Sequence, residues 1–75
     1  MKKGTKKLAD LEVIGSRIRE LRGEILQEEL ATFLGISQGQ LSKIERGKLG
    51  PTAEVLLRLA DKFGKTTDWM LSGKG

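Results

Sequence analysis

Short runs of apolar residues at helical spacing, most of them closed by a glycine, restrict what this chain can fold into. Residues at i, i+3, i+4 and i+7 share one face of a helix, and no stretch of useful length alternates with the period of two that marks a strand. The sequence therefore predicts an all-α domain, a compact five-helix bundle. The apolar positions expected to face its core are Leu11, Ile14, Ile18, Leu21, Leu30, Phe33, Leu34, Leu41, Ile44, Val55, Leu56, Leu59, Ala60 and Phe63.

Polar residues that cap helices mark the expected boundaries. Asp10, Ser37 and Thr52 stand where a side-chain oxygen can accept from the first turn, and Thr66 or Thr67 could do the same for a last short helix, DWML. Glycine favours the left-handed conformation that ends helices. The glycines expected to end the first four helices are Gly23, Gly35, Gly47 and Gly64.

The chain has 75 residues with no cysteine and no histidine. It thus lacks thiolate ligands, the commonest zinc ligand and the usual general base. We expect no enzyme activity, no metal and no cofactor. The absence of a long apolar run or a signal-peptide pattern argues against a membrane partner, so a cytoplasmic location is the expectation.

The formal net charge of +4 is concentrated in the first residues. Lys2, Lys3, Lys6 and Lys7 account for it, so the rest of the chain is neutral overall. We expect a basic flexible arm over residues 1–9, a folded domain over 10–73 and a short tail at 74–75. The arm could serve solubility alone, or it could contact phosphate or enter a groove.

Two expected helices meet around Gly35 in QEELATFLGISQGQLSKIE. Ala31 is small where the helices would cross, and Ile36 would lie beneath the turn. This helix, tight turn and helix is the helix-turn-helix pattern, in which the second helix lies in the DNA major groove.

The outward face of that second helix carries residues able to contact DNA: Gln38, Gly39, Ser42, Lys43 and Arg46. Glutamine can bond adenine, and lysine can bond guanine, through the major groove. Arg46 and Lys48 lie at the far end, where phosphates line the groove. A solvated polar face of an ordinary bundle is the alternative interpretation.

Five segments, in this order, resemble those of lambda-repressor-like helix-turn-helix domains, the family of phage repressors, Cro proteins and small bacterial regulators. They are IGSRIRELR, QEELATFLGIS, QGQLSKIERGK, PTAEVLLRLADKFG and TDWMLSG. The resemblance implies a double-stranded DNA partner.

The resemblance also assigns roles to matching positions. Base contacts are implied for Gln38, Gly39, Ser42 and Lys43. Backbone contacts are implied for Gln27, Ser37, Gln40, Arg46, Lys48, Leu49 and Gly50, the last three partly through backbone N–H groups. Gln27 would also brace Gln38, and Arg22 with Glu45 would form a largely buried structural salt bridge between the first and third helices.

Two residues depart from the family pattern. Leu26 stands where relatives place a capping Ser or Thr, at a cost of about 1 kcal/mol that burial of its side chain could partly offset. Gly39 has no side chain where many relatives contact a base.

The function expected is that of a sequence-specific transcriptional regulator, a repressor that binds a palindromic operator as a homodimer. An antitoxin that binds DNA and a toxin protein is the alternative within the same fold, and a protein-interaction module without DNA binding is a third. Trp69, Met70 and Leu71 would either cap the core or form a dimer contact.

Overall fold

The computed structural model describes residues 10–73, and the predicted arm and tail lie outside this range. The described residues form helices and loops without a strand. The helices are α1 (Leu11–Arg22), α2 (Gln27–Leu34), α3 (Gln38–Glu45), α4 (Ala53–Phe63) and α5 (Thr67–Ser72). The predicted fold class, a five-helix bundle with a helix-turn-helix, is confirmed.

Most helix starts carry the predicted caps. The side chains of Asp10, Ser37, Thr52 and Thr66 each accept from a backbone N–H of the first turn. Leu26 precedes α2 and makes no such bond. Four of the five helices therefore begin with a local bond that the sequence already specifies.

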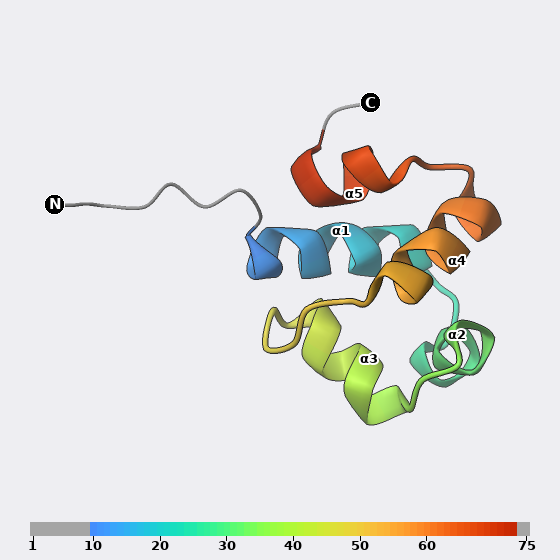
Figure 1. Ribbon diagram of the computed structural model, residues 1–75. Coiled ribbons are helices and arrows are strands. Elements are labelled where there is room, and N and C mark those ends of the chain that lie inside the picture. Colours follow the sequence, from blue (N-terminus) through green and yellow to red (C-terminus); the bar gives the residue numbers. More distant parts are fainter. Residues whose placement is uncertain (1–9, 74–75) are drawn as a thin grey trace, which may run out of the picture.

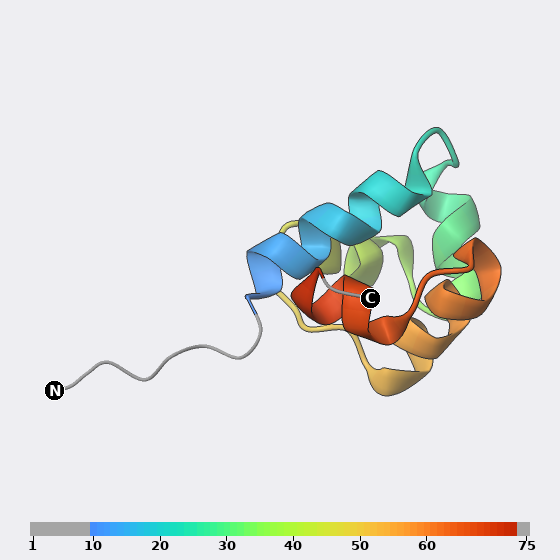
Figure 2. The ribbon, with the colours of Figure 1, turned by 90° about the horizontal axis from the view of Figure 1, so that it is seen from above.

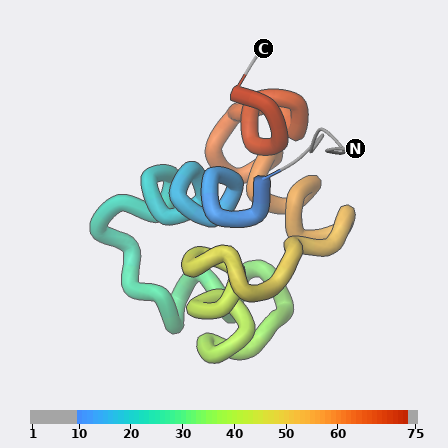
Figure 3. The backbone as a smooth tube through the Cα atoms, turned by 90° about the vertical axis from the view of Figure 1, so that its left-hand side faces the viewer, coloured from blue at the N-terminus to red at the C-terminus, as the bar shows by residue number. Residues whose placement is uncertain are grey.

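Helix α1 lies centrally, with α5 on one side and α3 on the other (Figure 1; Figure 3). Seen from above, α1 and α5 lie close to one another (Figure 2). Arg17 of α1 fixes this arrangement, since its Nη1 donates to the carbonyl of Met70 at 3.1 Å. The core between the helices consists of Ile14, Ile18, Leu30, Ala31, Leu34, Leu41, Ile44, Val55, Leu56, Leu59 and Met70.

Three expectations about this framework were wrong. Leu11 was expected to face the core but is 41% exposed, because it is the first residue of α1 and lies at the edge of the bundle. Phe33 was expected to face the core but is 40% exposed, and Lys62 lies over its ring with Nζ 4.7 Å from the centroid. Gly23 has a positive φ of 55°, but its ψ of −121° lies outside the left-handed helical region. Its N–H nevertheless closes α1 by donating to Arg19.

Candidate nucleic-acid interface

The turn between α2 and α3 is held by two backbone bonds. Gly35 adopts the left-handed conformation and donates to Thr32 at 3.1 Å, while Ile36 donates to Ala31 at 3.0 Å. Ala31 is buried, and Ile36 packs against the core. These contacts fix the direction in which α3 leaves the turn.

The start of α3 is held by a reciprocal capping box. Ser37 Oγ accepts from the N–H of Gln40 at 3.0 Å, and Gln40 Oε1 accepts from the N–H of Ser37 at 2.9 Å. Both side chains were expected to contact the DNA backbone. Because the amide oxygen of Gln40 is engaged in the cap, its NH₂ group is the part left to face a phosphate.

Helix α3 buries one side and exposes the other. Leu41 and Ile44 are buried in the core. On the other side Gln38, Gly39 and Lys43 are exposed, and Ser42 is half-buried. The residues expected to contact bases thus lie along the uncovered part of the helix.

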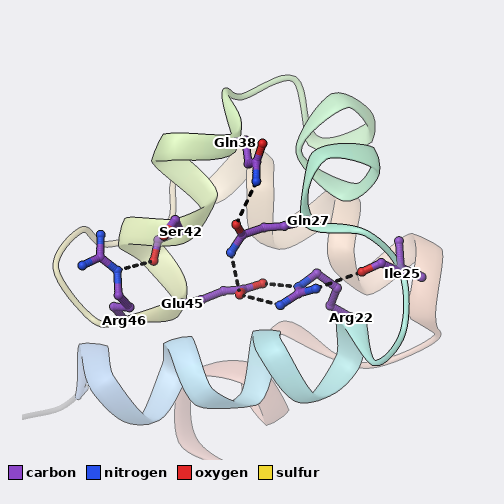
Figure 4. A network of polar contacts seen from close by, with 7 residues as sticks. All are labelled: Arg22, Ile25, Gln27, Gln38, Ser42, Glu45 and Arg46. Atoms are coloured by element: carbon purple, nitrogen blue, oxygen red, sulfur yellow. Dashed lines mark hydrogen bonds and ion pairs between the residues drawn. The ribbon is translucent and has the colours of Figure 1, made fainter.

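An ion pair between the buried Glu45 and the half-buried Arg22 joins the end of α1 to the end of α3 (Figure 4). Arg22 Nε lies 2.7 Å from Glu45 Oε2, and Arg22 Nη2 donates to Oε1 at 3.1 Å. Arg22 also donates to the carbonyl of Ile25 at 2.9 Å. The hydrogen bond to Glu45 raises the pKa of Arg22, so this guanidinium remains charged at any pH at which the domain is studied.

Gln27, at the start of α2, connects this ion pair to the exposed helix face (Figure 4). Its Nε2 donates to Glu45 Oε1 at 3.0 Å, and its Oε1 accepts from Gln38 Nε2 at 3.4 Å. The contact between Gln27 and Gln38 was expected, whereas the bond from Gln27 to Glu45 was not. No local pattern indicates that bond, because 18 positions separate the two residues.

In the loop after α3, only some of the backbone N–H groups expected to contact phosphate are available for it. The N–H of Gly47 donates to Ile44 at 3.1 Å and that of Lys48 to Lys43 at 2.8 Å, so the Lys48 amide is engaged in ending the helix. Within residues 10–73 the N–H groups of Leu49 and Gly50 have no such acceptor. Any backbone donation from this loop therefore falls to Leu49 and Gly50, with Lys48 contributing its ammonium group.

The far end of α3 gathers positive charge. Arg46 is exposed and held against the helix by a 3.3 Å bond from its Nε to the carbonyl of Ser42. Lys43 and Lys48 are also exposed. Three cations thus border the uncovered face of α3.

The apolar cluster on α5 divides between core and surface. Met70 is fully buried, which agrees with the alternative in which it caps the core and leaves its side chain unavailable to a partner. Trp69 and Leu71 are half-buried and pack against the core. Lys65 lies over the Trp69 ring, with Nζ 5.0 Å from the centroid.

In the part of the chain that the structure describes, no three His, Cys, Asp or Glu side chains come together as a metal site would require. None of the helices in residues 10–73 is long and apolar enough to cross a membrane.

The tight turn at Gly35, the capped second helix and its polar outer face define a helix-turn-helix protein. Comparison with known proteins agrees. The family model described as Helix-turn-helix matches residues 17–70, and the chain belongs to this family of transcriptional regulators.

Two curated relatives are HTH-type transcriptional regulators. YonR of Bacillus subtilis, derived from the SPbeta prophage, is 33% identical over an alignment of 63 residues that covers 81% of this chain and 58% of YonR. The regulator y4dJ of Sinorhizobium fredii is 41% identical over an alignment of 54 residues that covers 69% of this chain and 70% of y4dJ. The chain thus spans little more than half the length of YonR.

Solved structures show the same fold. The P22 c2 repressor in complex with a synthetic operator superposes with a TM-score of 0.76 at 33% identity, covering 83% of this chain and 97% of the repressor chain. The restriction-modification controller protein C.AhdI from Aeromonas hydrophila gives a TM-score of 0.71 at 30% identity, with the same two coverages.

Proposed function

We propose that this protein is a sequence-specific transcriptional repressor that inserts α3 into the major groove of double-stranded DNA. The observation that carries the proposal is Gln38, exposed in the first turn of α3 and held by Gln27. The N-terminal part of a recognition helix is the part that contacts base edges. Gln38, Gly39, Ser42 and Lys43 would make the base contacts.

The DNA backbone would be bound around this face. Arg46 and Lys48 supply cations, and the side-chain amides of Gln27 and Gln40 lie at the helix starts. Leu49 and Gly50 supply N–H groups that have no acceptor within residues 10–73. Such contacts fix the register of a protein on DNA without selecting a sequence. Ser37 belongs to the same set, since its hydroxyl hydrogen can still be donated while its oxygen caps α3.

A homodimer on a palindromic operator is the assembly that we propose. A helix-turn-helix dimer places its two recognition helices about 34 Å apart, so that they enter successive major grooves on one side of the duplex. The likeness to the P22 c2 repressor, whose structure contains an operator, supports both DNA binding and repression. Such a protein acts by occupying DNA in the cytoplasm and needs neither catalysis nor a cofactor.

The division of the chain follows from this function. Residues 10–73 would be the DNA-binding domain, with residues 1–9 as a basic arm and 74–75 as a tail. The arm would add nonspecific attraction to phosphate, since each lysine bound to DNA releases counterions.

Selection of bound sequences from a random duplex pool tests the proposal. We expect a palindromic consensus, and binding to it whose log K falls with log salt at a slope of about −0.9 per phosphate contacted. A pool that returns no consensus, from protein shown to be folded, would contradict sequence-specific binding. Salt-independent binding would contradict the phosphate contacts.

A further inference from the structure

Glu45 imposes an orientation on the group that faces it. A carboxylate only accepts hydrogen bonds. Glu45 has a side chain that is 4% exposed, and Arg22 holds it in place through two bonds. The side chain of Gln27, which approaches Glu45 Oε1 at 3.0 Å, must therefore present its NH₂ group to the carboxylate.

The orientation of the Gln27 amide in turn sets the orientation of the Gln38 amide. With the NH₂ group of Gln27 turned toward Glu45, its oxygen is left at the other end, facing Gln38. Gln38 must then present its own NH₂ group, and its Nε2 donates to this oxygen at 3.4 Å. The charge of one buried residue thus fixes the order of N and O atoms out to an exposed side chain (Figure 4).

This order limits what Gln38 can recognise. Its Nε2 carries two hydrogens. One of them is committed to Gln27, so one N–H and the oxygen remain. Adenine presents an acceptor and a donor in the major groove, which match this pair, whereas guanine presents two acceptors. A glutamine without a partner could turn both N–H groups toward guanine. Gln38 cannot, because Gln27 accepts one of them.

We propose that Glu45 acts as a positioning residue for specificity, making α3 prefer adenine over guanine by holding Gln27 and, through it, Gln38. This inference rests on the proposed DNA-binding function. It gives the ion pair between Arg22 and Glu45 a role beyond stability, although neither residue touches DNA in this scheme.

The test begins with duplexes selected by the wild-type protein. The Gln38→Ala variant identifies the base pair at which preference is lost, and the adenine-to-guanine affinity ratio is then measured there. In Glu45→Gln the single amide oxygen is drawn to Arg22, so its NH₂ group faces Gln27 and reverses both amides. We expect the adenine-to-guanine ratio to fall by about tenfold or more, the discrimination typical of one bidentate contact.

A matched control removes a carboxylate elsewhere. Glu54 pairs with Arg58 on the exposed side of α4, with Nε and Oε2 2.9 Å apart. Glu54→Gln changes the net charge of the protein equally, so it should shift affinity for all duplexes alike and leave the adenine-to-guanine ratio unchanged. An equal fall of the ratio in both variants would overturn the proposal, since net charge would then be the cause.

A second variant is needed in case Glu45→Gln does not fold, since it leaves the Arg22 guanidinium without a charged partner. Replacing a buried ion pair by apolar residues of similar volume is often tolerated. The double variant Arg22→Met with Glu45→Leu leaves no buried charge and no group to orient Gln27, and we expect it to fold and to lose most of the adenine preference.

The outcomes separate this inference from the proposed function. Wild-type protein without any consensus contradicts DNA recognition itself. A consensus that Gln38→Ala does not alter shows that Gln38 contacts no base, and a preference that survives in the folded double variant shows that Glu45 does not set it. Either of the last two results overturns the inference while sequence-specific binding stands.

Discussion

At Gly15 the backbone of α1 approaches the end of α3 so closely that a methyl group has no room. A Cβ atom on Gly15 would lie 2.3 Å from the carbonyl oxygen of Ile44 and 2.7 Å from that of Glu45. Both obstacles are backbone atoms, which cannot turn aside as a flexible side chain could. Gly39 differs, because among residues 10–73 a Cβ there would meet only Ser37 Oγ, at 3.9 Å.

Alanine should therefore act oppositely at these two glycines. We expect Gly15→Ala to lower the free energy of unfolding by about 3 kcal/mol or more, because α1 and α3 must separate. Gly39→Ala should keep or raise stability, by up to about 1 kcal/mol from the helix propensity of alanine. Urea denaturation followed by circular dichroism measures both, and equal losses in the two variants would contradict the argument.

Gly39→Ala also isolates the function of that glycine. Since the fold tolerates a side chain at position 39, an effect of the substitution on operator affinity alone would mean that α3 needs close approach to DNA there. Unchanged affinity and base preference would remove Gly39 from the proposed contacts.

Leu26 precedes α2 with backbone angles suited to a cap but with a side chain that cannot accept a hydrogen bond. The expected compensation by burial does not occur, since Leu26 is 63% exposed. Leu26→Ser should therefore stabilise the domain, by about 1 kcal/mol. A rise in the urea midpoint at constant slope is the expected result, and Leu26→Ala, which removes the apolar side chain without adding a cap, is its control. Equal midpoints for the serine and alanine variants would show that the cap contributes nothing.

At the scale of single helices, α3 combines two kinds of proposed contact that mutation can separate. Lys43 lies among the side chains proposed to contact bases, whereas Arg46 lies at the helix end, near the proposed phosphates. Base contacts discriminate between sequences, but phosphate contacts strengthen all of them.

Lys43→Ala is expected to weaken the cognate site by about 1–3 kcal/mol and to relax preference at one base pair. Arg46→Ala should weaken binding to cognate and scrambled duplexes about equally. It should also make the slope of log K against log salt shallower by about 1, the loss of one phosphate contact. Titration of both duplexes with each variant makes the comparison. If Lys43→Ala costs the same on scrambled DNA as on the cognate site, Lys43 contacts phosphate rather than a base.

The helices themselves could be predicted because their determinants are local. The spacing of Ile14, Ile18 and Leu21 fixes a face, and Asp10 caps a helix two or three residues away. The orientation of Phe33 could not be predicted in this way. It stands at the edge of the apolar face of α2, where the packing of α4 decides whether a ring is covered.

For the whole molecule, the contacts that fix helices relative to one another join residues far apart in the chain. Arg17 and Met70 are separated by 53 positions, and Arg22 and Glu45 by 23. The family resemblance predicted the pair of Arg22 and Glu45, because relatives carry a corresponding salt bridge. Nothing in the sequence pointed to Gly15 as a crossing point or to Glu45 as a partner of Gln27, since both depend on the angle between packed helices.

Self-association is a property of the whole molecule that the exposed part of α5 can test. Of the α5 cluster only Trp69 and Leu71 have surface left to cover. Tryptophan is among the residues that most often contribute a large share of the binding energy at protein interfaces. We expect Trp69→Ala to raise the dissociation constant of the dimer by about tenfold or more, measured by sedimentation equilibrium.

Leu57 provides the control, because it is 62% exposed on α4 and presents a comparable apolar surface. Leu57→Ala should leave the dissociation constant unchanged if the dimer forms through α5. Thermal melts must first show that both variants are folded, since Trp69 also packs against the core. A folded Trp69→Ala protein that dimerises normally would exclude this surface, and a loss caused by Leu57→Ala instead would place the dimer contact on α4. The surface so identified sets the distance between the two recognition helices of the dimer. That distance, about 34 Å where the helices enter successive major grooves, determines the spacing of the half-sites in the operator.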